Sequence, residues 1–281
     1  MESTKFDVGP RFSVILPTHN RAGVVRNAIA SVLAQADGDF ELIVIDDGST
    51  DGTSEMLARA VGDPRVKILR RENGGPARAR NTALAHARGR FVAFIDSDDT
   101  WRPEHLATRR RHLARSRRVD FLLGGVECVG SPLLPDKFDP TRLVDVRSLY
   151  GVCGTFVVRR ELLVKVGGFP EVAYSEDGDL MRKLLSEARV ARRVRDVTYL
   201  YDRTRDDSIC NVLQKLHAQP RERDLVRFAR PQQPGRAHAI ARPLELPATP
   251  SLLPRRPSAL PPPVSALDTS ALYCPPNLTR P

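Results

Sequence analysis

The sequence has no long apolar run and no closely spaced cysteine pair. Its longest apolar stretches, such as FVAFI at residues 91–95, are strand-sized and far below the roughly 20 residues needed to cross a bilayer. Residues 1–12 (MESTKFDVGPRF) contain no apolar signal region, so we expect a cytoplasmic protein. The four cysteines lie far apart without a C-x-x-C pair, which argues against a zinc site and predicts reduced, structural thiols.

Basic side chains dominate the charge balance, whereas aromatic residues are scarce. The formal net charge is +10, which suits nucleic acid, a membrane surface or anionic ligands. The densest basic run, RRRHLARSRR at residues 109–118, has no interleaved aromatics and belongs to no recognisable nucleic-acid module. We therefore predict a solvated helix face and no nucleic-acid partner. Peripheral contact of this run with an anionic membrane is the alternative left open.

The first hundred residues alternate between strand-like apolar runs and helix-like stretches, as in an α/β domain with a mainly parallel sheet. Strands are predicted at residues 12–16, 41–45, 66–69 and 91–95, and helices near residues 24–36, 54–60 and 77–87. Ligands of such open sheets bind beyond the carboxyl ends of the strands. The loops that begin at Pro17, Asp46 and Asp96 are therefore expected to share one rim.

The second half of the chain is less regular. Strands are predicted at residues 119–125, 154–158 and 197–201, and a helix near residues 179–186. More than half of the chain's 23 prolines lie beyond residue 216, where periodicity is weak. We expect one domain over residues 8–212 and a disordered Pro/Arg-rich tail over residues 217–281.

The loops after the first three strands carry polar residues whose roles the local sequence leaves open. Residues 17–21 (PTHNR) can hydrogen-bond a flat heterocycle or shape a turn. Residues 46–53 (DDGSTDGT) supply turn glycines and helix caps, and a carboxylate there can accept an N–H from a base such as uracil. Residues 72–81 (ENGGPARARN) bring glycines and two arginines to a helix start, which suits a phosphate, although the lysine and hydroxyl of a Walker loop are missing.

Two acidic clusters follow. Residues 96–99 (DSDD) end an apolar strand, where they can be solvated or cap a helix, or can hold a cation that relieves their mutual repulsion. Residues 175–179 (SEDGD) can enrich the first turn of a helix in negative charge, as the helix dipole favours. The local sequence of residues 96–99 does not decide between solvation, capping and cation binding. For residues 175–179 taken alone, the helix-dipole interpretation is sufficient.

The order of the segments is more specific than any one of them. SVILPTHNR, ASVLAQ, ELIVIDDGSTDGT, ENGGPARARNTAL, GRFVAFIDSDD and YSEDGDL follow one another along residues 11–210. Together they closely resemble the family-two nucleotide-sugar glycosyltransferases, which have the GT-A fold. The resemblance implies a mainly parallel central sheet flanked by helices and an inverting transfer of a sugar, UDP-linked by preference, to an acceptor hydroxyl. A glycan, a lipid-linked saccharide or a small molecule is the expected acceptor.

The resemblance also assigns roles to residues. It places Thr18, His19 and Asp47 at the nucleoside, with Asp47 on the base. Asp98 is the expected direct ligand of Mg²⁺ or Mn²⁺, because hard oxygen ligands beside a diphosphate suit these ions. Asp96 is expected at the ribose or the metal's water shell, and Asp177 as the base that takes the acceptor's proton. The nucleotide-sugar site is further expected to include Pro17, Asn20, Arg80, Asp99, Glu176 and Arg205.

The sequence departs from the family pattern near residues 199–210 (YLYDRTRDDSIC). Asp202 stands where a basic residue is expected, and Arg205 falls near the position of a diphosphate-binding histidine. A nucleotide-sugar-binding or scaffold protein with impaired turnover is therefore one alternative. A nucleotidyltransferase is another, because it can share the sheet and the metal carboxylates, but the glycine-rich, basic first loop expected for a triphosphate is missing.

Overall fold

Strands in the first half of the chain form the buried centre of the fold. The computed structural model describes residues 9–60, 62–135, 142–146, 152–172, 176–208 and 210–212. Strands β1 (Phe12–Thr18), β2 (Phe40–Asp47) and β4 (Phe91–Phe94) are buried at every position, whereas β3 (Val66–Arg71) is partly exposed at the sheet edge. The continuous apolar runs arise because both faces of this sheet are covered.

The other helices and strands complete the α/β arrangement. They are α1 (Val25–Leu33), α2 (Thr53–Ala60), α3 (Pro76–His86), β5 (Thr100–Trp101), α4 (His105–Ala114), β6 (Phe121–Leu123), β7 (Val126–Gly130), β8 (Leu133–Pro135), β9 (Leu143–Asp145), β10 (Val157–Arg159), α5 (Arg160–Lys165), α6 (Glu176–Glu187), β11 (Ala191–Arg193) and β12 (Tyr199–Arg203).

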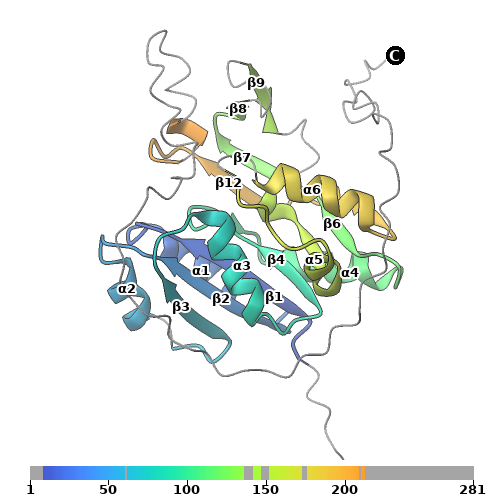
Figure 1. The fold of residues 1–281 in the computed structure, drawn as a ribbon, viewed down its shortest axis with the longest axis horizontal. Coiled ribbons are helices and arrows are strands. Elements are labelled where there is room, and N and C mark those ends of the chain that lie inside the picture. Colours follow the sequence, from blue (N-terminus) through green and yellow to red (C-terminus); the bar gives the residue numbers. More distant parts are fainter. Residues whose placement is uncertain are drawn as a thin grey trace, which may run out of the picture. The chain divides into compact units, whose positions relative to one another are not determined.

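A seven-stranded sheet with the order β11-β6-β10-β4-β1-β2-β3 runs through the molecule (Figure 1). All its neighbouring strands pair in parallel except β10, which is antiparallel to β4 and β6. The predicted mainly parallel sheet is thus confirmed. The register pairs Thr18 with Asp46, so β1 and β2 end at the same edge, as expected for the rim.

Helices cover both faces of the sheet. Val14 and Leu16 face a core that includes residues of α1, α2 and α4, whereas Ile15 faces a core built with α3, α5 and α6. Figure 1 shows α3 over one face and α1 behind the sheet. The period of two along β1 therefore divides its side chains between two cores.

The second half of the chain differs from its prediction in detail. The strand predicted at residues 197–201 begins at Tyr199 and joins a separate sheet of order β5-β12-β7. Residues 153–155 form a 3₁₀ turn before β10 that overlaps the start of the strand predicted at residues 154–158. Helix α6 begins at Glu176, three residues before the predicted start. The prediction began too late because the apolar periodicity on which it rested begins only near Leu180.

Two sequence-based predictions concern residues outside the described ranges. The predicted tail over residues 217–281 lies wholly there, as does the predicted domain start at residue 8. Within the described residues, every helix is too short or too polar to cross a membrane. Cys153, which is buried, and Cys210 form no disulfide among the described residues.

The basic run at residues 109–118 is only partly the solvated face that we predicted. Arg109 is completely buried, and its Nη2 donates to Gly124 O at 2.8 Å. Burial lowers the pKa of Arg109 to about 10 despite the charge of Asp196. The prediction was wrong at Arg109 because α4 packs this side of the helix against the chain between β6 and β7, a contact that charge density alone does not reveal.

A second buried basic residue, His105, links α4 to the small sheet. Its ring stacks on Trp101, with centroids 4.2 Å apart, and Nδ1 lies 2.9 Å from Thr198 Oγ1. Nε2 is buried without a hydrogen-bond partner in the described chain. Burial, followed by the charge of Arg109, holds the pKa of His105 well below its usual value, so the ring is neutral near pH 7.

We predict that His105 makes the protein less stable in mild acid. As pH falls below the unfolded-state pKa near 6.5, His105 is protonated in the unfolded chain but stays neutral in the folded one. Proton uptake therefore favours the unfolded state, and stability is lost. His105→Phe retains an aromatic ring without this proton. The free energy of unfolding of the wild type, relative to His105→Phe, should fall by about 1.4 kcal/mol per pH unit between pH 6 and 5. Urea titrations at several pH values measure this slope, and parallel pH profiles for the two proteins would contradict it.

Candidate active site

The loops that follow β1 and β2 are tied together at the rim. Asn20 adopts a left-handed backbone with φ of 51°, and its amide donates to Ser49 Oγ at 2.9 Å. Its side-chain oxygen accepts from Thr50 N at 2.8 Å. Thr18 is buried, and its hydroxyl has no partner in the described chain. Pro17 is the second-last residue of β1 and pairs with Ile45 of β2, so it lies just before these two linked loops.

Asp47, at the end of β2, is enclosed by the third loop. Its carboxylate accepts from Gly75 N at 2.7 Å and from Gly74 N at 3.1 Å, and Arg71 Nε lies 3.4 Å away. His19 Nδ1 is 2.9 Å from Asp47 O, which joins the first loop to the second. A carboxylate has about four acceptor positions, so Asp47 retains capacity for a further donor.

The carboxylates after β4 stand close together in a poorly hydrated place. Burial, followed by the charge of Asp96, raises the pKa of Asp98 to about 6. Asp99 is 1% exposed, and burial with the charges of Asp96 and Asp98 raises its pKa well above the usual value. The repulsion expected from the sequence is therefore present in the fold.

Arg80 connects this cluster to helix α6. Its guanidinium is 6% exposed and donates through Nη2 to Asp96 Oδ1 at 2.7 Å and through Nη1 to Glu176 Oε1 at 2.6 Å. It also lies over the Phe169 ring, 5.2 Å from the centroid. Arg80 thereby draws the end of β4 and the first turn of α6 to one place, although 80 residues separate Asp96 from Glu176 in sequence.

Asp177 follows Glu176 and is fixed by two backbone donors. Oδ1 accepts from Gly178 N at 2.8 Å and Oδ2 from Cys153 N at 3.3 Å. Burial and then the charge of Glu176 raise the pKa of Asp177. The carboxylate is thus oriented, and its proton affinity is increased.

Arg205 lies near the carboxylates but is already paired. Its Nε and Nη2 each donate to Asp207 at 3.0 Å. Arg21 Nη1 donates to the same carboxylate at 3.1 Å. Asp98 raises the pKa of Arg205 as a lesser influence after Asp207, so the two residues are electrostatic neighbours. Asp207, which sequence reasoning missed, therefore orients both arginines at this side of the rim.

Tyr199 is a second residue that sequence reasoning missed. Its ring is fully buried, and its hydroxyl donates to Asp99 Oδ2 while accepting from Asp96 N at 3.4 Å. A Cβ on Gly154 would overlap this ring, so glycine is required there for the ring to fit. Asp202 N donates to Asp99 Oδ1 at 2.8 Å, so β12 braces the carboxylate at both oxygens. The sequence indicated only that Tyr199 lies in a predicted strand.

The carboxylates at the rim offer oxygen atoms to a cation, but too few of them converge to coordinate it fully. In the described part of the chain, no group of three His, Cys, Asp or Glu side chains is arranged to hold a metal ion by itself. Mg²⁺ is usually bound by one or two carboxylates together with substrate phosphates. The raised pKa of Asp98, with Asp96 beside it, fits a site that a cation completes only with a phosphate-bearing ligand.

This sheet, with its carboxylate rim, is that of a GT-A protein. S. aureus TarS 1–349 in complex with UDP-GlcNAc matches with a TM-score of 0.59 and 30% identity, over 69% of this chain and 59% of that one. The family model described as "Glycosyl transferase family 2" matches residues 13–163, more than half of the chain. The chain belongs to this family, which confirms the predicted fold and enzyme class.

Relatives with named activities cover parts of the chain. WfgD of Escherichia coli, a UDP-Glc:alpha-D-GlcNAc-diphosphoundecaprenol beta-1,3-glucosyltransferase, is 34% identical over 64% of this chain and 71% of its own length. TuaG of Bacillus subtilis, a putative teichuronic acid biosynthesis glycosyltransferase, is 39% identical over 46% of this chain. The chain spans 52% of TuaG.

One structural neighbour holds a metal. The mannosyltransferase PcManGT from Pyrobaculum calidifontis, in complex with GDP-Man and Mn²⁺, matches with a TM-score of 0.55 and 29% identity. The match covers 69% of this chain and 57% of that chain. Divalent metal use thus occurs on this fold in a neighbour.

We predict that the Tyr199 hydroxyl stabilises the carboxylate cluster. Tyr199→Phe leaves Asp99 Oδ2 without its buried donor and should lower the free energy of unfolding by about 1–3 kcal/mol. Tyr201→Phe is the matched control, because that hydroxyl donates to the weak acceptor Cys210 Sγ, at 3.5 Å. Urea unfolding of the two variants measures the difference, and equal stabilities would show that the Tyr199 contact is dispensable.

Proposed function

We propose that the chain transfers a sugar from a nucleotide-sugar donor to an acceptor hydroxyl, with inversion at the anomeric carbon. The observation that carries this proposal is the Arg80 bridge, which brings the carboxylates after β4 to the first turn of α6, where Asp177 stands. This arrangement supports the proposal, because the candidate metal ligands Asp96 and Asp98 and the candidate base then share the rim where open sheets bind ligands.

The donor is proposed to bind across the first two loops. The orphaned Thr18 hydroxyl and His19 offer polar contacts for a nucleoside, and Asn20 holds their loop against Ser49. Asp47 can accept an N–H from the base at an oxygen already oriented by Gly74 and Gly75. A UDP-linked donor is favoured because the named donor of WfgD and the ligand of the TarS complex are both UDP-sugars.

Asp98 and Asp96 would hold Mg²⁺ or Mn²⁺. The bound cation supplies charge neutralisation for the departing nucleoside diphosphate. Asp98 is partly buried, and its desolvation, followed by the charge of Asp96, raises its pKa, so a nearby cation would stabilise its ionised form. Arg80 forms ion pairs with Asp96 Oδ1 and Glu176 Oε1. We therefore propose that it orients these two carboxylates relative to the donor.

Asp177 would act as the general base. Its carboxylate takes the proton of the acceptor hydroxyl while that oxygen forms a bond to the anomeric carbon and the bond to the diphosphate breaks. The backbone donors Cys153 N and Gly178 N fix its direction, and burial raises its proton affinity toward that useful for a base at neutral pH. One displacement from the face opposite the leaving group inverts the sugar.

The acceptor is proposed to be a growing glycan or a lipid-linked saccharide in polysaccharide biosynthesis. This rests on the named acceptor of WfgD and on the teichuronic acid role given for TuaG. A cytoplasmic enzyme acting at an anionic membrane surface would suit such an acceptor.

A nucleotide-sugar-binding protein with impaired turnover is a second candidate. It is favoured by Asp207, which pairs with both Arg21 and Arg205 and so compensates the charges available to a diphosphate. Family membership argues against the nucleotidyltransferase alternative.

We predict that Asp177→Asn lowers kcat by about 10²–10⁴-fold while donor affinity stays within about twofold, because only the proton acceptor is lost. Asp179→Asn is the matched control in the same helix turn, since Asp179 pairs with Arg182. Release of nucleoside diphosphate with a range of donors measures turnover, and calorimetry measures donor binding. Unchanged turnover in Asp177→Asn would remove Asp177 from the reaction, and absence of turnover in the wild type with normal UDP binding would favour the second candidate.

We predict that a chelator abolishes transfer and that added Mn²⁺ or Mg²⁺ restores it. Asp98→Asn should raise the Mn²⁺ concentration for half-maximal activity by about tenfold or more, because one ionic ligand is lost. Asp39→Asn, far from the rim in an exposed pair with Arg11, should leave it unchanged. Full activity in excess chelator would refute metal dependence.

A further inference from the structure

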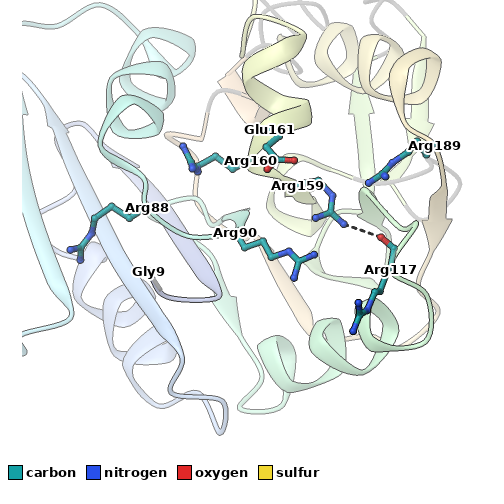
Figure 2. A pocket seen from close by; sticks show the side chains of 8 residues that line it. All are labelled: Gly9, Arg88, Arg90, Arg117, Arg159, Arg160, Glu161 and Arg189. Carbon is teal, nitrogen blue, oxygen red and sulfur yellow. Dashed lines mark hydrogen bonds between the residues drawn. The ribbon is translucent and has the colours of Figure 1, made fainter. Parts of the chain in front are cut away.

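A cavity lined by arginines lies apart from the candidate active site. Its volume is about 510 Å³, and its walls are formed by Gly9, Arg88, Arg90, Arg117, Arg159, Arg160, Glu161 and Arg189 (Figure 2). Six of the eight lining residues are arginines that come from separate parts of the chain. No step proposed above uses this cavity.

The cavity lies at the opposite edge of the central sheet from the rim. Gly9 precedes β1, Arg90 directly precedes β4, and Arg159 ends the antiparallel strand β10. These positions mark the amino ends of the parallel strands. At about 3.3 Å per residue, β1 alone separates the two edges by roughly 20 Å. A donor held at the rim therefore leaves this cavity free.

Positive charge in the cavity exceeds the acidic charge that faces it. Asp120 pairs with Arg159 at 2.6 Å and with Arg189 at 2.7 Å, and Glu41 pairs with Arg88 at 3.1 Å. Arg90, Arg117 and Arg160 have no carboxylate partner among the described residues, although Arg160 Nε donates to Gly89 O at 3.1 Å. Glu161 is the one acidic residue in the lining, against these three guanidinium groups.

Contacts with neighbouring groups position two of the arginines, Arg159 and Arg90. Arg159 Nη2 also donates to Arg117 O at 3.2 Å, and its guanidinium lies 5.0 Å from the Phe91 centroid. Arg90 lies 5.7 Å from the same centroid. Figure 2 shows the Arg90 and Arg159 side chains reaching into one region. Asp120 is shared by Arg159 and Arg189, and Arg90 has no carboxylate partner among the described residues, so the positive charge around the Phe91 ring is only partly neutralised.

We propose that this cavity binds a phosphate-bearing anion. Guanidinium groups present paired N–H donors that match phosphate oxygens bidentately. The volume exceeds what a single carboxylate fills, and three uncompensated guanidinium groups suit a multivalent anion. Such an anion can be a free diphosphate or the headgroup of an anionic lipid, which present the same chemistry to the arginines.

Binding by the full-length protein tests the proposal. Inorganic pyrophosphate is titrated by calorimetry with EDTA present, which suppresses metal-dependent binding at the rim. Vesicles of phosphatidylglycerol in phosphatidylcholine are tested separately by co-sedimentation. The test variant is Arg90→Gln with Arg117→Gln, both exposed side chains. The control, Arg59→Gln with Arg195→Gln, removes two exposed charges outside the cavity.

The expected result is a loss of affinity of about tenfold or more in the test variant and not in the control. Loss for pyrophosphate identifies a free phosphate ligand, and loss for vesicles alone identifies a lipid headgroup. No binding of either probe by the wild type, equal binding by all three proteins, or equal losses in both variants would overturn the proposal. Circular dichroism and thermal midpoints establish that the variants are folded.

Discussion

The buried guanidinium of Arg80 is the constraint on which the candidate site depends. A charge removed from water must be paired, and Arg80 satisfies this by binding Asp96 and Glu176 at once. These carboxylates belong to the end of β4 and the start of α6, which no strand pairing joins. Because the ion pairs hold at short distances, the rim and Asp177 share one environment, and their charges influence one another.

The negative charges of the carboxylates in this environment are only partly compensated by the groups around them. Burial and mutual repulsion raise the pKa values of Asp98, Asp99 and Asp177, although Tyr199 and the backbone amides of Asp202, Cys153 and Gly178 offset part of the cost. A bound cation would relieve the remaining repulsion between the carboxylates. The clustering of these carboxylates is therefore consistent with the proposed binding of a cation together with a phosphate-bearing donor.

The two edges of the sheet gather different kinds of charged residue. Carboxylates gather where the parallel strands end, and arginines gather where they begin. The basic run at residues 109–118 is the densest in the sequence, yet Arg117 is its one residue in the lining of the arginine cavity. Arg109 of the same run is buried in the interior. The cavity's other arginines come from distant segments, so only chain topology assembles them.

The sequence by itself determined the first four strands, the three helices between them and the rim, because apolar period and turn residues are local signals. Its ordered motifs also indicated the family and pointed to Asp96, Asp98 and Asp177. Tertiary structure alone decided that Arg80 is shared by two carboxylates, that Tyr199 braces Asp99 beside Gly154, and that α6 starts at Glu176. These features depend on contacts between residues as many as 103 positions apart. Such contacts leave no periodic trace in the sequence, because burial and pairing are properties of the packed chain.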